Sequence, residues 1–305
     1  MAANRSGPVI GAARVSCGPD AGPDCTYGVA SATPLVDIPA VLDPRTGICA
    51  LAPLEIQLLL IVIAFLAGVG ITAIGPGGIF LTMALYALLP IAPPTIAGTA
   101  SATFIATGLV GSAAYLRSGE LARRSNRVLA WILSAASIAG ALAGSRLNPY
   151  LPKSIFGALL GGMAILTGVL IIVQQVRGLE TLAALELDSA AGRVIIAVLG
   201  FGIGLSGALL GVGGPVLAVP ALVVLGVPIV PAVAVAQLQS IFIAAFATVG
   251  YAVQGAVSWP LALLVGVPEV IGVVVGWRVA QRAAPGRLKV ALGVTLVAVG
   301  TYLLL

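Results

Sequence analysis

The chain has 305 residues, of which 60% are hydrophobic and only 8% are charged, and its formal net charge is +5. Soluble domains carry about 25% charged residues, so this composition excludes a water-soluble globular protein and indicates an integral membrane protein. Backbone polar groups in lipid must pair internally, which favours helices over irregular structure. The basic residues lie in short loops, so they predict topology rather than a nucleic-acid partner. Histidine does not occur, and we expect neither a metal nor a cofactor.

Residues 1–53 come first in the chain and differ from everything that follows. They are rich in Pro, Gly, Ala and Asp and show no sustained hydrophobic periodicity, so we predict a disordered N-terminal tail. All three cysteines (Cys17, Cys25 and Cys49) lie in this tail, with a spacing that matches no zinc or CxxC pattern. That placement argues against a membrane thiol–disulfide carrier.

Ten apolar segments follow, five in each half of the remaining chain. We predict a first membrane repeat over 54–175, a connecting loop over 176–191 and a second membrane repeat over 192–305. The expected helices are 54–74, 76–90, 95–116, 128–146 and 154–175 in the first repeat and 192–210, 213–227, 230–252, 257–278 and 288–305 in the second. The second segment of each repeat is short and bounded by Gly and Pro, which is typical of a broken helix at a transporter's binding site.

The two halves also align with each other. Gly75-Pro76-Gly77-Gly78 matches Gly211-Val212-Gly213-Gly214 at an offset of 136 residues (211 − 75), and the same offset relates Tyr115 to Tyr251. Further along, an offset of 132 relates Arg146 to Arg278 (278 − 146). A duplicated hydrophobic unit that is interrupted by glycines indicates a secondary transporter whose site lies between the repeats.

Loop charges distinguish two possible topologies. If the short segments cross the membrane, the repeats are inverted, and ten basic residues gather on one side against two, Arg146 and Lys153, on the other. If the short segments are re-entrant, the repeats are parallel and the split is six against six. The positive-inside rule favours the crossing topology, with the 117–127 loop in the cytoplasm and the 253–258 loop outside. Fifteen residues span only about 23 Å of the ~30 Å hydrocarbon core, which favours the re-entrant alternative.

We predict that the glycine clusters form the substrate site. Without Cβ atoms their backbone can adopt positive φ and approach a ligand, and the helix that begins after each cluster directs its free N–H groups toward an anion. Tight helix packing is the alternative, since Gly is common at membrane helix interfaces. The predicted residues are Gly75, Gly77, Gly78, Gly211, Gly213 and Gly214.

Neutral hydrogen-bonding residues near the start of the third segment in each repeat extend this predicted site. They suit an oxyanion that must be bound and then released, because no fixed cation holds it. Interhelical hydrogen bonds, worth about 0.6 kcal/mol each, are an equally open interpretation. These residues are Thr99, Ser101 and Thr103 in the first repeat and Gln237, Gln239 and Ser240 in the second.

Apart from Glu55 at the very start of segment 54–74, Glu269 is the only acidic residue inside a predicted membrane segment. Burial of a carboxylate there costs about 2.5–3.5 kcal/mol on insertion scales, so the group is either neutral or paired. We expect it to carry a coupling proton, and a structural pairing beside Pro268 is the alternative. Arg146 and Arg278 end equivalent segments, where we favour interfacial anchors over contacts with the anion.

The run Gly204-Leu205-Ser206-Gly207-Ala208-Leu209-Leu210-Gly211-Val212-Gly213-Gly214, with Pro220 and Leu222 after it, resembles the glycine motif of the sulfite exporter TauE/SafE family. The resemblance covers nearly everything from about 54 to 305. Pro215 stands where that motif usually has a third consecutive glycine, and Pro76 interrupts the first copy. The resemblance implies a permease of the bacterial or archaeal inner membrane with duplicated halves. It also implies sulfite, organosulfonates or related sulfur anions as substrates.

Together these features predict an all-α polytopic membrane protein of about ten helices in two five-segment repeats, inverted with respect to each other. We expect a secondary transporter, not an enzyme, whose partners are a small anion and the lipid bilayer of the cytoplasmic membrane. The anion is sulfite, an organosulfonate or a related sulfur oxyanion, and the proton or membrane potential drives its transport. The alternative is a non-transporting membrane anchor subunit of a partner complex, which would not need paired broken helices or Glu269.

Overall fold

The computed structural model describes residues 53–117, 124–177, 189–282 and 285–304. Within these ranges the chain forms ten α-helices and two short 3-10 helices, and they contain no β-strand. This confirms the prediction of an all-helical protein. The predicted tail over 1–53 lies outside the described residues except for its last residue, as do most of the 117–127 and 176–191 loops, so these assignments stay predictions.

The first five helices follow the predicted apolar segments to within a few residues, except at the start of the second and fourth. They are α1 (Leu54–Ala73), α2 (Ile79–Leu88), α3 (Pro93–Arg117), α4 (Arg124–Leu147) and α5 (Lys153–Arg177), with the 3-10 helices η1 (Pro76–Gly78) and η2 (Asn148–Tyr150) between them. Proline begins both α3 and η1, where its missing N–H would have no helical partner and its fixed φ suits the first turn. The chain between α2 and α3 starts with an extended residue, Leu89.

The second five helices are α6 (Ala190–Leu210), α7 (Pro215–Val224), α8 (Ile229–Val253), α9 (Trp259–Arg282) and α10 (Pro285–Leu304). Ser189 is the N-terminal cap of α6, and its side chain accepts a hydrogen bond from the Gly192 N–H. It ends at Gly211, which adopts the left-handed conformation with a φ of 62°. Helix α7 starts directly on Pro215 and contains a second proline, Pro220.

In the part of the chain that the structure describes, seven helices are long and apolar enough to cross a membrane: α1, α3, α4, α5, α6, α8 and α9. Three shorter apolar stretches, Pro76–Leu88, Pro215–Val224 and Val290–Leu304, accompany them. Helices α2 and α7 have 10 residues each, so each rises about 15 Å, which is half of the hydrocarbon core. Among the described residues, seven of the ten predicted segments therefore combine the length and the apolar composition of a membrane span. Whether α2 and α7 cross stays a prediction.

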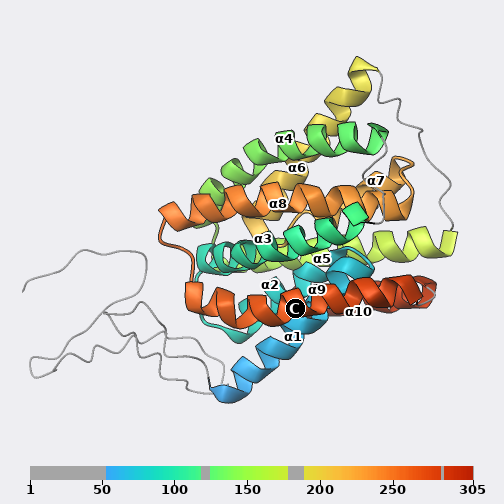
Figure 1. Cartoon of the computed structure of the whole chain (residues 1–305). Helices are drawn as coiled ribbons and strands as arrows, with labels where there is room; N and C mark the ends of the chain where they lie inside the picture. Colours follow the sequence, from blue (N-terminus) through green and yellow to red (C-terminus); the bar gives the residue numbers. More distant parts are fainter. Residues whose placement is uncertain (1–52, 118–123, 178–188, 283–284, 305) are drawn as a thin grey trace, which may run out of the picture. The chain divides into compact units, whose positions relative to one another are not determined.

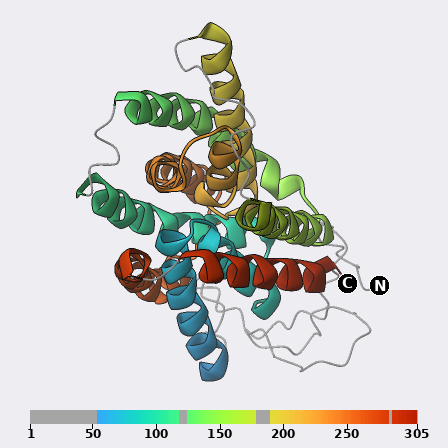
Figure 2. The same cartoon turned by 90° about the vertical axis from the view of Figure 1, so that its right-hand side faces the viewer.

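Helices from the two halves of the chain pack against each other. Helix α8 lies between α3 and α4 in the view of Figure 1, and it packs on both. Helix α4 also packs on α6, α3 also packs on α9, and α5 runs against α10, a pair that the turned view of Figure 2 shows as well. Small residues permit this close packing, because a Cβ at Gly140 or Gly144 of α4 would overlap the backbone carbonyls of Phe201 or Leu205 in α6.

Helix α9 approaches α1 with similar closeness. A Cβ at Gly272 would overlap the carbonyl oxygen of Phe65, and one at Gly276 would overlap that of Val69. On the α1 side, a Cβ at Gly68 would overlap the carbonyl oxygen of Glu269. This crossing therefore holds Glu269 against α1, the helix that leads into the first glycine cluster.

Candidate functional site

A small cavity lies where the breaks after α1 and α6 meet. Its volume is about 10 Å³, roughly the space that one water molecule needs. All of the residues around it are buried. They are Ile71, Gly75, Gly78, Phe104, Thr107, Val212, Gly213, Pro215 and Ser240. We name this space the central cavity.

The backbone around the central cavity takes conformations that require glycine. The φ angles of Gly75, Gly211 and Gly213 are 112°, 62° and 74°, which residues with a side chain rarely adopt. The Thr82 hydroxyl donates a hydrogen bond to the Gly211 carbonyl, so α2 is tied to the second break. The two breaks thus form one structural unit although they are far apart in the sequence.

Both short helices begin at the central cavity. Gly78 is the N-terminal cap of α2, and Pro215, which follows the cap residue Gly214, is the first residue of α7. Gly78 and Pro215 both line the cavity. The first turn of an α-helix carries N–H groups without a helical partner and the positive end of the helix dipole. The cavity is therefore bordered by two positive helix ends, an arrangement that suits an anion.

The other three glycines of the clusters pack against helices instead of lining the cavity. A Cβ at Gly77 would overlap the backbone of α1 at Ala67 and Gly70, and one at Gly211 would lie against the backbone of Ala97 in α3. At Gly214 it would meet the Ser240 backbone at 3.3 Å. The alternative interpretation of the clusters, close helix packing, therefore describes these three positions.

The predicted polar residues of α3 lie away from the central cavity. The Thr99 hydroxyl accepts a hydrogen bond from the Ser258 N–H at 3.1 Å, and the Thr103 hydroxyl donates to the Ala100 carbonyl at 2.9 Å. Ser101 is buried without lining the cavity. Thr107 does line it, and the sequence interpretation missed it, although it follows Thr103 by one helical turn and so lies on the same helix face.

Of the three predicted residues in α8, only Ser240 lines the central cavity. The Gln237 side chain donates from Nε2 to the carbonyl oxygen of Ile71, at 3.0 Å, and so holds α8 to the cavity-lining turn of α1. Its Oε1 has no hydrogen-bond partner among the described residues, and neither amide atom of Gln239 has one. Gln239 is fully buried. A buried amide without partners is energetically costly.

Glu269 is fully buried at the crossing of α1, α3 and α9. The side chain of Thr103 lies beside its carboxyl group. Neither carboxyl oxygen lies within ordinary hydrogen-bonding distance of a partner among the described residues. Glu269 adjoins the helix that supplies Phe104 and Thr107 to the central cavity. Its role as a carrier of the coupling proton stays a prediction, with a structural pairing as the alternative.

Two buried tyrosines brace the helix ends next to the breaks. The Tyr115 hydroxyl donates to the Thr72 carbonyl at 2.9 Å, and the Tyr251 hydroxyl donates to the Ala208 carbonyl at 2.9 Å. Both bonds join residues that are 43 positions apart. The alignment of the two halves had singled out these tyrosines without assigning them a role.

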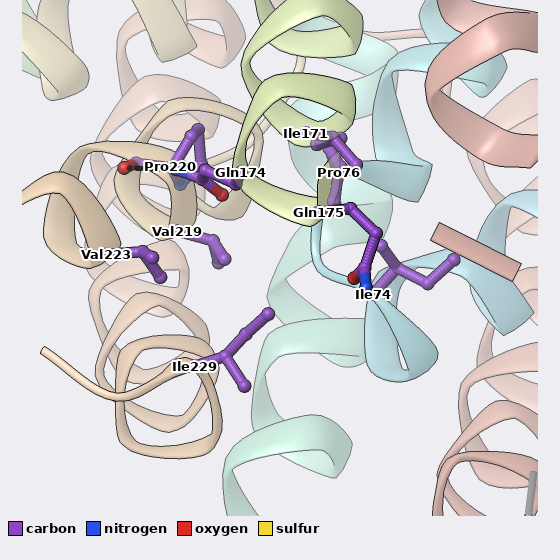
Figure 3. Close-up of a pocket in the computed structure, with 9 residues that line it drawn as sticks. All are labelled: Ile74, Pro76, Ile171, Gln174, Gln175, Val219, Pro220, Val223 and Ile229. Carbon is purple, nitrogen blue, oxygen red and sulfur yellow. Dashed lines mark hydrogen bonds between the residues drawn. The ribbon is translucent and has the colours of Figure 1, made fainter. Parts of the chain in front are cut away.

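A larger hollow of about 160 Å³ lies beside the central cavity, and we name it the vestibule. Figure 3 shows that residues from α5, α7, the start of α8 and the break after α1 surround it. The Gln174 side chain donates from Nε2 to the Pro220 carbonyl at 3.0 Å, and the exposed Gln175 extends toward Ile74. The lining residues are Ile74, Pro76, Ile171, Gln174, Gln175, Val219, Pro220, Val223 and Ile229.

Comparison with known proteins places this geometry in context. The family model described as "Sulfite exporter TauE/SafE" matches residues 60–303. The probable membrane transporter protein YdhB of Bacillus subtilis (strain 168) is 26% identical over 249 residues, which cover 81% of this chain and 100% of that relative. No solved structure matches the chain.

Proposed function

Because this chain belongs to the sulfite exporter TauE/SafE family and is a multi-pass membrane transporter, we propose that it moves a small sulfur oxyanion across the cytoplasmic membrane. The substrate is sulfite, an organosulfonate or a related anion, and the central cavity is its binding site. The protein works as a secondary transporter, with alternating access around this cavity and with the proton or membrane potential as its energy source.

The observation that carries this proposal is the convergence of two helix N-termini on one buried space. Helix α2 begins directly after its cap residue Gly78, and α7 begins at Pro215; both of these residues line the central cavity. The hydroxyl-bearing residues Thr107 of α3 and Ser240 of α8 also line the cavity. No Lys or Arg occurs among the lining residues, so the donors are neutral groups and helix dipoles. Such a site binds an oxyanion without holding it as tightly as a buried cation would.

The positions of the helices support our proposal of two five-helix repeats. Helices α6, α7 and α8 start 136 residues after α1, α2 and α3 (190 − 54, 215 − 79 and 229 − 93). The two tyrosine hydrogen bonds recur at the same offset. A five-helix unit reverses direction if every helix in it crosses the membrane, so the second unit is inverted relative to the first. Rocking of one unit against the other then exposes the cavity to each side in turn.

We assign the coupling proton to Glu269. The carboxyl group is fully buried on α9, and its neighbour Thr103 belongs to α3, which also supplies Phe104 and Thr107 to the central cavity. A neutral carboxyl group is tolerated in this position, whereas an unpaired carboxylate is costly at membrane depth. Protonation therefore favours the arrangement seen here, and loss of the proton favours a state in which the group reaches water or a partner.

Flux measurements on purified protein in liposomes test the proposed function. The assay compares uptake of sulfite and of a small organosulfonate with uptake of a small organic cation, at several substrate concentrations. We expect saturable uptake of the anions, mutual competition between them and no uptake of the cation. A non-transporting anchor subunit would leave the liposomes as impermeable to all three solutes as protein-free liposomes.

A further inference from the structure

We propose that Val219 is the gate between the vestibule and the central cavity, and that α7 opens this gate by bending at Pro220. The proposal rests on the transport function proposed above, since it assigns the access route of the small oxyanion to the vestibule. It follows from the positions of the two hollows relative to each other.

The vestibule and the central cavity meet at one contact between α7 and the first break. Ile74 and Pro76 line the vestibule, whereas Gly75 between them lines the cavity. On α7, Pro215 lines the cavity and Val219, one helical turn later, lines the vestibule. A Cβ added to Gly75 would come within 2.9 Å of the Val219 Cγ2. The Val219 side chain therefore packs directly on Gly75 and separates the two spaces.

Size and burial show which of the two spaces is accessible in this conformation. The vestibule has about 160 Å³, and its rim contains the exposed Gln175 and the partly buried Val223 and Ile229. The central cavity has about 10 Å³ and only buried lining residues. A sulfur oxyanion fits the first space and exceeds the second. Access to the central cavity therefore requires that Val219 move away from Gly75.

The sequence of α7 indicates how this movement occurs. Valine is branched at Cβ and has few χ1 rotamers in a helix, so the side chain cannot simply swing aside. Pro220 has no N–H to donate to the Val216 carbonyl, which weakens the helix directly after the gate residue. The Gln174 side chain holds the Pro220 carbonyl at 3.0 Å. This hydrogen bond from α5 therefore stabilises the closed position of α7, and its loss accompanies opening.

The vestibule offers amide donors to an anion that waits outside the closed gate. Among the described residues that line it, Gln174 and Gln175 have polar side chains, and the others are apolar or proline. Figure 3 shows the two amides on different sides of the hollow, one toward Pro220 and the other toward Ile74. A small oxyanion that takes the Gln174 amide from the Pro220 carbonyl would release the bend in α7. Substrate arrival and gate opening are thus linked through one side chain.

Thiol labelling of purified protein in detergent tests the gate. Single cysteines replace Ser240 in the central cavity or Gln175 on the vestibule rim, in a chain that lacks Cys17, Cys25 and Cys49. The probe is a small cationic methanethiosulfonate, which is not itself a candidate substrate. We expect the cysteine at 175 to react rapidly and the cysteine at 240 slowly. Val219→Ala removes two methyl groups from the Gly75 contact, so it should accelerate labelling at 240 about tenfold.

Val223→Ala is the matched control, because Val223 also lines the vestibule on α7 but lies one turn beyond the gate. It should leave labelling at position 240 unchanged, and neither alanine variant should alter labelling at 175. Val219→Ile provides a second variant that keeps the contact and should slow labelling at 240. Equal rates at 240 with Val219→Ala and without it would overturn the proposal, as would equal acceleration by both alanine variants. The labelling rate is measured without a transported solute, so this test is independent of the flux assay. Absence of flux in liposomes would reject the proposed transport function but would not reject the proposed gate.

Discussion

The two buried tyrosine hydrogen bonds should contribute unequally to stability, although their geometry is the same. The Tyr251 hydroxyl donates to the Ala208 carbonyl, which also accepts a hydrogen bond from the Gly211 N–H at 3.2 Å. The Tyr115 hydroxyl donates to the Thr72 carbonyl. The residue four positions after Thr72 is Pro76, which has no N–H to donate. Removal of the Tyr115 hydroxyl therefore deprives a buried carbonyl group of a partner that the helix cannot replace.

This difference determines how much each substitution should lower the free energy of unfolding. Tyr251→Phe leaves the Ala208 carbonyl with one remaining donor, so the cost should be that of an ordinary hydrogen bond, about 0.5–1.5 kcal/mol. Tyr115→Phe adds the desolvation penalty of an unsatisfied buried acceptor, about 1–3 kcal/mol. Tyr302→Phe is the control, because Tyr302 is 76% exposed and its replacement should change the free energy of unfolding by less than about 0.5 kcal/mol.

The assay is reversible unfolding in mixed micelles by titration with sodium dodecyl sulfate, followed by tryptophan fluorescence. The free energies of unfolding of the three variants are compared with that of the wild type. The reasoning predicts that Tyr115→Phe costs more than Tyr251→Phe. Equal losses, or a larger loss for Tyr251→Phe, would refute the argument that Pro76 leaves the Thr72 carbonyl dependent on Tyr115.

Two further predictions concern coupling and topology. Glu269→Gln keeps the size of the side chain but cannot exchange a proton. The variant should therefore still bind substrate, while its flux loses the dependence on an imposed pH gradient. The control is Glu55→Gln, at the exposed start of α1, which should retain that dependence. An unchanged gradient dependence in a well-folded Glu269→Gln protein would rule out the proton role. Single cysteines in the 117–127 and 253–258 loops should react with an impermeant thiol reagent from opposite sides of the membrane, and reaction of both from one side would favour the parallel, re-entrant topology.

The helices were predictable from the sequence because long apolar runs without charges have few other stable structures in lipid. The predicted segment 230–252 corresponds to the helix Ile229–Val253, and the predicted segment 95–116 corresponds to the helix Pro93–Arg117. Segment 76–90 became a 3-10 turn and a helix of 10 residues. Its first three residues, Pro76, Gly77 and Gly78, form the 3-10 helix η1, and two of them are glycines, which have low α-helix propensity.

The candidate site was predictable only in part. Glycine spacing located both breaks, but it could not separate Gly213, which lines the cavity, from Gly77, which packs on α1, because that depends on neighbours distant in the sequence. Hydroxyl and amide residues identified the polar positions of an apolar helix, but the sequence did not indicate which face of that helix lines the cavity. Thr107 was missed for that reason, and Val219 carries no polar signal at all. Its importance depends on a single contact across the fold, with Gly75.

The most direct test of the proposed function compares sulfite flux through Gly213→Leu and Gly202→Leu proteins in liposomes. Gly213 lines the central cavity, and a Cβ there would come within 3.3 Å of the Phe104 ring. Gly202 lies exposed on α6, and a Cβ there would meet no atom within 4 Å. We predict that Gly202→Leu transports as the wild type does, whereas Gly213→Leu inserts into the membrane but transports nothing. Sulfite flux at the wild-type rate through Gly213→Leu would contradict a substrate path through the central cavity.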